Sequence, residues 1–268
     1  MTQSIPHIMS GGESFFFRGN HIGILCLHGF MASPAEIRWL GKHLADQGAT
    51  VYGPRLPGHA TDYHDMTRQR WQDWYAAAED ALTVLRAQCD RVFVVGHSMG
   101  GMLGLLLAAN SNTPIDGLAA LATPVLFTNR SMANASWIKW MRPYTDQSDS
   151  GPLVQLIRDE QVRRGETVVG RVRHGLWSTA AVGELFALSL AVQACLPDVQ
   201  VPLTLIYSEA DKTVGLNNRD MILNRVKSAI IEQHTLKNSD HILPQDSERE
   251  TVFGLVADFI KRSSNPSP

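Results

Sequence analysis

The segment that most constrains this chain joins a buried strand to a buried helix between residues 91 and 109. It starts with a short apolar run rich in β-branched residues at 91–95, which is typical of a strand covered on both faces. The motif Gly-X-Ser-X-Gly follows at 96–100, and an apolar run at 102–109 predicts a helix. Because strand, sharp turn and helix are the setting of a nucleophile elbow, the segment predicts an exposed Ser98 hydroxyl at the end of a strand.

The residues around this serine fit a tight turn. Gly96 and Gly100 would lie where the turn presses against its own backbone, so that a Cβ at either position would clash. Ser98 would lie at a helix N-terminus, whose free N–H groups favour negative charge nearby. A plain Gly/Ser turn between a strand and a helix is the simpler alternative, so a catalytic interpretation needs partner residues elsewhere in the chain.

The rest of the chain alternates between strand-like and helix-like segments. Strands are predicted at 21–27, 50–53, 91–95, 116–121, 201–207 and 230–236, and helices at 34–47, 71–87, 102–109, 217–226 and 247–261. The first helix has a favourable start, with Ser33 as its N-cap, Pro34 in the first position and Glu36 in the third. Alternation of this kind predicts an α/β fold with a mostly parallel central sheet and helices on both faces. The functional site is then expected beyond the carboxyl ends of the strands.

The alternation stops between residues 125 and 196, where helical periods and several breakers occur. A stretch of this length is too long for a loop in a compact domain. We therefore expect a helical cap at 125–196, inserted into one core formed by residues 1–124 and 197–268.

Apolar side chains of this cap are candidates for a substrate pocket, although they could equally form the cap's own core. The candidates are Trp137, Trp177, Leu185 and Phe186. The cap also carries arginines at 158, 163, 164, 171 and 173, which we expect on a solvated face. If two of them pointed inward, a substrate bearing a carboxylate would become plausible.

Composition and charge exclude several classes of function. The net charge of −2 and the isoelectric point near 6.5 give no basic surface for nucleic acid. No apolar run reaches the roughly 20 residues that span a membrane, and no secretion signal precedes the first strand. We expect a cytoplasmic protein, monomeric or homodimeric, without a transmembrane segment.

The metal-binding and redox residue types are sparse. Cys26, Cys89 and Cys195 lie far apart, which fits reduced thiols better than a disulfide framework. The ten histidines show no metal-ligand spacing. We therefore expect no metal and no cofactor.

A nucleophilic serine needs a histidine base, and the base needs a carboxylate to fix its tautomer. Asp211 directly follows the strand at 201–207, and His241 lies in the loop between the last strand and the last helix. Taken alone, either residue could be an ordinary surface residue. Their order, with Ser98 first, Asp211 second and His241 third, and their places just past strands match the triad order of an elbow enzyme. Rivals are Glu209 for the acid, and His28, His59 and His64 for the base.

Two backbone amides are expected to stabilise the oxyanion of the reaction. One is the N–H of Met99, the residue after the nucleophile. The second comes from the loop after the strand that ends at Leu27, where we choose the N–H of Phe30.

With these motifs in place, the chain resembles the α/β-hydrolases, and within them the small bacterial carboxylesterases and monoacylglycerol lipases. The matching motifs are Leu27-His28-Gly29-Phe30, Pro54-Arg55-Leu56-Pro57-Gly58-His59, Trp71-Gln72-Asp73-Trp74, Gly96-His97-Ser98-Met99-Gly100-Gly101, Asp211-Lys212-Thr213-Val214 and Asp240-His241. The resemblance implies a triad of Ser98, Asp211 and His241, with Phe30 and Met99 as oxyanion donors. The chain departs from the family at Ala60, often a glycine there, and in the cap, where no counterpart of the glycerol-binding glutamate of these lipases can be placed.

The expected function is hydrolysis of carboxylic esters of small or acyl-chain substrates through an acyl-enzyme. Another reaction on the same triad, carbon–carbon bond hydrolysis or cofactor-free peroxidation, is the alternative, because a fold does not fix a reaction. A hydrolase-like binding protein without catalysis is a third possibility, and it has no need of Asp211 or His241.

Overall fold

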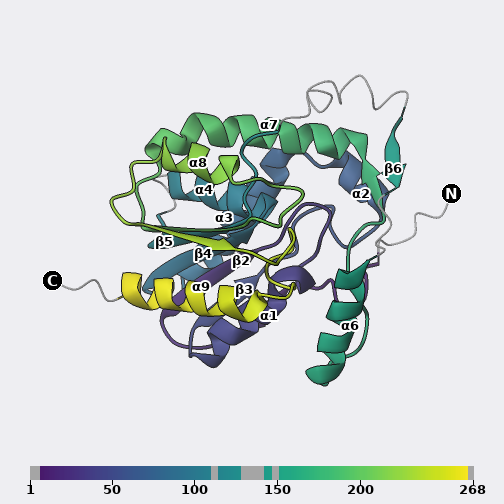
Figure 1. Cartoon of the computed structure of the whole chain (residues 1–268), viewed down its shortest axis with the longest axis horizontal. Coiled ribbons are helices and arrows are strands. Elements are labelled where there is room, and N and C mark those ends of the chain that lie inside the picture. Colours follow the sequence, from purple (N-terminus) through teal and green to yellow (C-terminus); the bar gives the residue numbers. More distant parts are fainter. Residues whose placement is uncertain (1–6, 110–113, 128–141, 147–150, 265–268) are drawn as a thin grey trace.

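The computed structural model describes residues 7–109, 114–127, 142–146 and 151–264. Its centre is a seven-stranded sheet in the order β1-β3-β2-β4-β5-β8-β9 (Figure 1). The strands are β1 (Phe15–Phe17), β2 (Ile22–Leu27), β3 (Thr50–Gly53), β4 (Arg91–His97), β5 (Gly117–Leu121), β8 (Leu203–Ser208) and β9 (Ile231–Leu236). Only β1 pairs antiparallel, with β3, whereas the other neighbours in this sheet are parallel. The predicted α/β class with a mostly parallel sheet is confirmed.

Helices cover both faces of this sheet, as predicted. On one face lie α1 (Ala35–Asp46) and α9 (Arg249–Ser264), whose apolar sides share one hydrophobic cluster with the strands. On the other face lie α3 (Trp71–Arg86), α4 (Met99–Ala109) and α8 (Asn217–Leu223) (Figure 1).

The middle strands show why their sequences lack an alternating polar pattern. In β2, Leu25 and Leu27 point into the cluster that contains α4, whereas Ile24 and Cys26 point into the cluster of α1 and α9. All four side chains are at most 1% exposed. A strand buried on both faces must be apolar throughout, and this is what the run at 22–27 shows.

The helix α1 begins one residue later than expected. Ala35 is its first residue, and Pro34 takes the cap position without a side-chain hydrogen bond. The Ser33 hydroxyl donates instead to the carbonyl of Val172, at 2.8 Å. The expectation that Ser33 caps this helix is therefore wrong, because its hydroxyl finds a partner in a distant segment of the chain.

The segment between β5 and β8 is only partly helical. It contains α6 (Pro152–Arg163) and α7 (Thr179–Cys195), but also an antiparallel strand pair of β6 (Tyr144–Asp146) and β7 (Leu176–Ser178). Outside this segment, the short helix α2 (Tyr63–Arg68) forms in the polar stretch before α3, where the Asp62 carboxylate caps it. The two helices agree with the helical insertion expected there, whereas the strand pair was not predicted.

A buried carboxylate connects α6 to the core. Glu160 lies on α6 and is 4% exposed. It accepts hydrogen bonds from Arg163 and Arg164 at the end of the same helix. It also accepts one from Arg249 at the start of α9, at 2.7 Å. These charge-assisted bonds join the segment between β5 and β8 to the core.

The stretch Thr179–Asp198, which contains α7, is by length and composition apolar enough to cross a membrane. One side of this helix packs against the core, because Leu188 and Val192 are fully buried in the same cluster as α4. The helix runs across α4 on the outer side of the fold (Figure 1). Packing against the core therefore accounts for only part of its apolar composition, since Leu190 on the same helix is 50% exposed.

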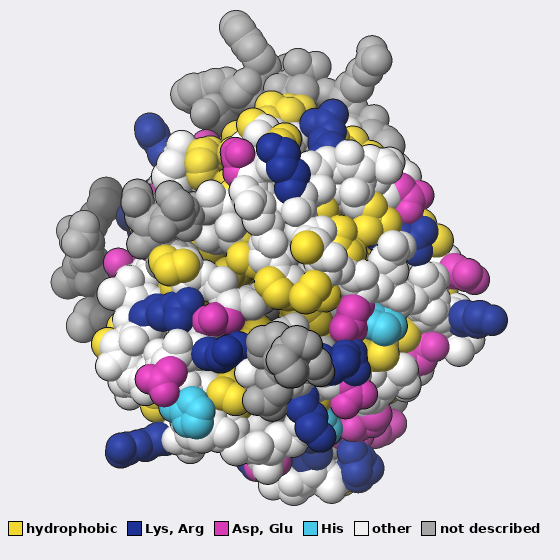
Figure 2. All heavy atoms as spheres, turned by 90° about the vertical axis from the view of Figure 1, so that its left-hand side faces the viewer, with side chains coloured by type: hydrophobic (Ala, Val, Ile, Leu, Met, Phe, Trp, Pro, Cys, Tyr) yellow, Lys and Arg dark blue, Asp and Glu magenta, His cyan; other side chains and the backbone are white. Residues whose placement is uncertain are grey.

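Figure 2 shows the face of the molecule that lies on the left of Figure 1. On this face, positive and negative side chains are interspersed around hydrophobic side chains near its centre. This distribution agrees with the small net charge of −2.

Candidate active site

The turn between β4 and α4 has the strained geometry that its sequence predicts. Ser98 has a φ of +53°, a left-handed value that a residue with a Cβ rarely adopts. Its amide donates to the carbonyl of Leu121 on the neighbouring strand, at 2.8 Å. A Cβ at Gly96 would collide with the backbone of Gly100, and one at Gly100 would collide with the carbonyl of Leu27. Both glycines are therefore required by close backbone approach.

The structure brings together the three side chains that the sequence pointed to. The Nε2 atom of His241 lies 3.0 Å from the Oγ of Ser98, and its Nδ1 lies 2.9 Å from an Oδ2 of Asp211. Ser98 follows β4, Asp211 follows β8 and His241 follows β9, so all three lie at one edge of the sheet. This geometry would allow Ser98 to act as a nucleophile, with His241 as its base and Asp211 as the orienting acid.

The surroundings of Asp211 fix its charge and the tautomer of His241. The Asp211 side chain is fully buried, and its Oδ1 accepts the amides of Thr213 and Val214 at 2.7 and 2.8 Å. Burial opposes its ionisation, but the hydrogen bond and charge of His241 and these two amides outweigh burial and lower the pKa of Asp211. An ionised Asp211 accepts the Nδ1–H of His241, which leaves Nε2 free to accept the Ser98 proton.

The rival histidines have other partners. His28 is buried, its Nδ1 faces the carbonyl of Gly29 at 2.9 Å, and its Nε2 accepts the amide of Leu56. Burial lowers the pKa of His28 to about 4. His59 is also buried and faces the carbonyl of Pro57, whereas His64 lies beside the hydroxyl of Tyr144. These contacts support structural roles for all three.

Phe30 and Met99, the residues expected to supply the oxyanion amides, both lie close to Ser98, in the lining of its cavity and next to it in the chain. Met99 is the first residue of α4, and Phe30 lies in the loop after β2 that lines the same cavity as Ser98. Among the described residues, no acceptor pairs with the amide N–H of either one. Both amides are therefore available to an oxygen that develops charge beside Ser98.

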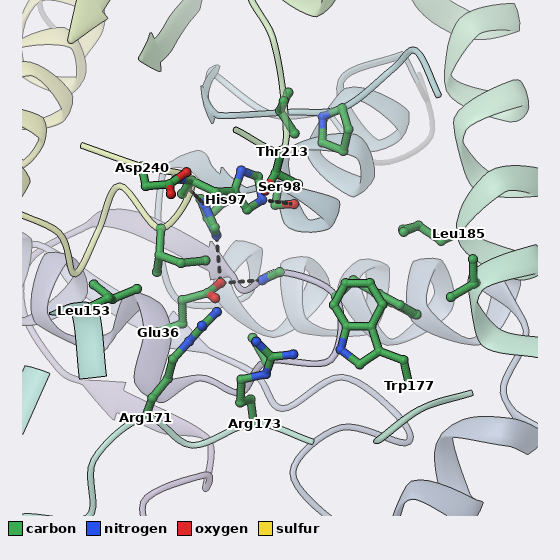
Figure 3. Close-up of a pocket in the computed structure, with 18 of the residues that line it drawn as sticks. Glu36, His97, Ser98, Leu153, Arg171, Arg173, Trp177, Leu185, Thr213 and Asp240 are labelled. Atoms are coloured by element: carbon green, nitrogen blue, oxygen red, sulfur yellow. Dashed lines mark hydrogen bonds and ion pairs between the residues drawn. The ribbon is translucent and has the colours of Figure 1, made fainter. Parts of the chain in front are cut away.

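A buried pair next to the triad was not predicted. The carboxylate of Glu36 lies 2.8 Å from the Nδ1 of His97, and the Nε2 of His97 lies 2.8 Å from the backbone carbonyl of His241 (Figure 3). The sequence predicts Glu36 at the third position of the helix at 34–47 and gives His97 no role. One signal was available, because Glu36 shares a helix face with the buried Leu40 and Leu44, where a charged residue needs a partner.

The electrostatics of this pair favour the ionised form. Burial raises the pKa of Glu36, but the charge and hydrogen bond of His97 outweigh it, and the pKa falls to about 2. Burial likewise opposes the charging of His97, but Glu36 outweighs this effect and raises the pKa of the imidazole above its usual value.

A cavity of about 530 Å³ opens in front of Ser98 and His241. One wall consists of core loops and includes Phe30, Thr213 and Ile242. The opposite wall comes from the segment between β5 and β8. It contributes two arginines, Arg171 and Arg173, and six apolar side chains (Figure 3). The apolar side chains are those of Leu126, Phe127, Leu153, Trp177, Val182 and Leu185.

Of the predicted pocket residues, Trp177 and Leu185 line this cavity. Phe186 does not, and its ring contacts that of Phe127, with centroids 6.4 Å apart. Trp137 lies outside the described residues. The arginine expectation is wrong at two positions, because Arg171 and Arg173 line the cavity instead of a purely solvated face.

Within the described residues, no group of three or more metal-binding side chains lies together. The three cysteines are free, and burial raises the pKa of each thiol. A raised thiol pKa disfavours the nucleophilic thiolate, so the cysteines do not compete with Ser98 as nucleophiles.

Comparison with known proteins agrees with this geometry. Residues 20–248 match the profile of the Hydrolase_4 family, described as serine aminopeptidase, S33. A thermostable monoacylglycerol lipase of Bacillus sp. (strain H-257) is 28% identical over 98% of this chain and 99% of its own length. A carboxylesterase of Bacillus subtilis (strain 168) is 22% identical over 93% of this chain and 96% of its own length.

Solved structures give the same picture. One solved structure comes from work on LipS and LipT, two metagenome-derived lipolytic enzymes. It matches with a TM-score of 0.85 and 26% identity, over 96% of this chain and 100% of that one. The monoacylglycerol lipase of Paleococcus ferrophilus matches with a TM-score of 0.76 and 15% identity, over 93% of this chain and 98% of that one. The second likeness supports the fold alone.

Proposed function

The chain belongs to the serine aminopeptidase S33 family of α/β-hydrolases, and from this premise we propose that it hydrolyses carboxylic esters through Ser98, His241 and Asp211. The observation that carries the proposal is the continuous hydrogen-bonded path from the Ser98 hydroxyl through His241 to the buried Asp211. The lipase and esterase relatives, which match over nearly the whole chain, support esters as the substrate class.

The reaction proceeds in two acyl-transfer steps. Nε2 of His241 takes the Ser98 proton while Oγ attacks the ester carbonyl carbon, and the amides of Phe30 and Met99 stabilise the resulting oxyanion. The C–O bond to the alcohol breaks, and the alcohol leaves with the proton from His241. Water then attacks the acyl-enzyme, with His241 again as the base, and the carboxylic acid leaves as Ser98 regains its proton.

The cavity suggests two kinds of ester. The apolar side chains of Trp177, Val182 and Leu185 fit an acyl chain or an apolar alcohol. Arg171 and Arg173 line the same cavity, and guanidinium groups bind carboxylates well. Esters that carry a free carboxylate are therefore a second substrate class for the same reaction.

Carbon–carbon bond hydrolysis and cofactor-free peroxidation on the same triad remain the alternative activities. Neither is favoured by the relatives that span this chain. A substrate panel separates the possibilities: aryl esters with graded acyl chains, monoacylglycerols, half-esters of dicarboxylic acids and dienones. Turnover of dienones with none of the esters would replace the proposal with the alternative.

The catalytic assignment is tested with Ser98→Ala and a fluorophosphonate probe. The wild-type protein should incorporate one probe on Ser98, and Ser98→Ala should lose both the label and at least about 10³-fold of the ester kcat/KM. Retention of ester turnover by Ser98→Ala would refute the triad. An absence of both labelling and turnover in the wild type would favour a non-catalytic binding protein.

A further inference from the structure

Four groups from four segments of the chain form one hydrogen-bonded link beside the catalytic centre. The amide of Gly29 donates to Oε1 of Glu36 at 2.8 Å, and the same oxygen accepts from Nδ1 of His97 at 2.8 Å. The other ring nitrogen of His97 lies 2.8 Å from the carbonyl of His241. Gly29 precedes the proposed oxyanion donor Phe30, so the link connects the oxyanion loop with the loop of the base (Figure 3).

The partners of His97 determine where its protons lie. The carbonyl of His241 can only accept, so Nε2 of His97 must carry a hydrogen. Nδ1 faces a carboxylate oxygen that also accepts the Gly29 amide, and a carboxyl group is normally the stronger acid of the two. His97 is therefore an imidazolium that donates from both nitrogens, and Glu36 is a carboxylate.

This ion pair is almost completely enclosed. The side chains of His97 and Glu36 are 1% and 5% exposed. The charged or titratable groups that face the pair are Arg171, Asp211, His28 and His241, from four different segments. Because a buried ion pair adds little to stability compared with apolar packing, its presence next to the triad needs another explanation.

Gly29 allows the pair to lie against the nucleophile. A Cβ on Gly29 would be 3.0 Å from Oε1 of Glu36, 3.3 Å from Nδ1 of His97 and 3.4 Å from Cβ of Ser98. The rings of His97 and His241 have centroids 5.1 Å apart. The Glu36–His97 pair therefore fills the space between the backbone at Gly29 and the ring of His241.

We propose that the Glu36–His97 ion pair is a positioning unit for the ester hydrolysis proposed above. It holds the Gly29-Phe30 backbone and the His241 backbone at a fixed separation, so that the oxyanion donor and the base meet the same substrate carbonyl. Neither side chain takes part in bond making. Both act through groups that do, and the proposal rests on the proposed function.

The kinetic test compares Glu36→Gln, His97→Asn and the double variant. Gln keeps the shape of Glu36 but removes the charge that holds the Nδ1 proton, and Asn is too short to reach both acceptors of His97. Each single variant should lower kcat for an aryl ester about 10²-fold while KM changes less than threefold, because misplacement by about 1 Å has an effect of this size. The double variant should lose no more than the worse single variant, since both changes break one link.

A matched control and a spectroscopic measurement separate positioning from general damage. Glu160→Gln also removes a buried, ion-paired carboxylate, but one outside the cavity lining, so it should lower the melting temperature and leave kcat unchanged. In ¹⁵N-histidine NMR of the wild type, both ring nitrogens of His97 should show the protonated signature at pH 7.5. Glu36→Gln should convert His97 to a neutral ring, and His97→Asn should remove its signals.

Two results would overturn the proposal directly. Wild-type kcat in Glu36→Gln or His97→Asn would overturn positioning, and a neutral His97 ring in the wild type would overturn the ion pair even if the variants fail to fold. The labelling rate of Ser98 by a fluorophosphonate provides a readout that needs no ester, and it should fall about 10²-fold in the folded variants. If the wild type shows neither labelling nor ester turnover, the proposed function fails and the positioning proposal fails with it.

Discussion

The two walls of the cavity are built in opposite ways. In the core wall, polar side chains are held by hydrogen bonds, as for His241, whose two ring nitrogens contact Ser98 and the buried Asp211 behind it. The wall from the segment between β5 and β8 is formed mainly by apolar side chains such as Trp177 and Leu185, which are placed by packing. Hydrogen bonds fix atoms to within tenths of an ångström, whereas packing fixes a shape. The first wall suits bond making and the second suits substrate selection.

The largest expected effect tests the core wall. Asp211→Asn should lower ester kcat about 10³- to 10⁴-fold, because an amide can donate to Nδ1 of His241 and so stabilise the wrong tautomer. Glu209→Gln, an exposed carboxylate two residues earlier, is the matched control and should retain wild-type rates. The measurement is steady-state hydrolysis of a p-nitrophenyl ester. Equal losses in both variants would mean that the loop, and not Asp211, matters.

The next effect tests the opposite wall. Leu185→Trp adds bulk inside the cavity, so turnover of esters with eight or more acyl carbons should fall at least about tenfold relative to the acetate ester. Leu190→Trp lies on the same helix at a side chain that is 50% exposed, and it should leave the chain-length profile unchanged. A uniform loss for all chain lengths in Leu185→Trp would show that this wall does not select the acyl chain.

A smaller effect is expected from the cavity arginines. Arg173→Ala should reduce kcat/KM for a half-ester of a dicarboxylic acid by roughly fivefold to tenfold, since it removes one charge-assisted contact of about 1 kcal/mol or more. A neutral ester of equal length should be unaffected. Arg225→Ala, at an exposed position outside the cavity lining, is the control. If both esters lose activity equally, Arg173 shapes the cavity and does not recognise charge.

The smallest effect concerns stability in acid. The Arg163 hydrogen bond, opposed by burial and reinforced by Arg164 and Arg249, lowers the pKa of Glu160 to about 2, from a usual value of 4.5. Because this folded-state pKa is depressed, its contribution to the free energy of unfolding is complete above about pH 4.5 and is lost as the pH falls towards 2. Glu160→Gln should therefore lower that free energy by roughly 1–3 kcal/mol at pH 7 and flatten its decrease between pH 5 and pH 3. Urea denaturation at these pH values measures both, and an unchanged slope would contradict the assignment.

The contrast between the walls also explains what the sequence could predict. The strands were recognisable because a strand buried on both faces must be apolar, as β2 and residues 92–95 of β4 are. The candidate triad could be located because each member lies shortly after the end of a strand, and parallel strands bring their carboxyl ends to one edge. Ser98, Asp211 and His241 are thus placed by local sequence and sheet topology together.

Other features depend on contacts that no local pattern encodes. The Ser33 hydroxyl bonds to Val172, 139 residues away, so its preference for a helix cap is overridden. Glu36 and His97 are 61 residues apart, and either one alone resembles a helix-start acid or a spare histidine. The inward direction of Arg171 and Arg173 likewise depends on how the chain before β7 crosses the cavity, which periodicity does not encode.

The helix α7 both lines the cavity and packs against the core, through residues on neighbouring turns. Leu185 is 8% exposed, belongs to the main hydrophobic cluster and also lines the cavity, while Leu188 is fully buried against the core. A substitution that widens the cavity at Leu185 therefore also removes core contacts, so a broader substrate range would be gained there at the expense of thermal stability. Directed evolution should find a more tolerant position at Arg173, which lines the cavity outside both hydrophobic clusters.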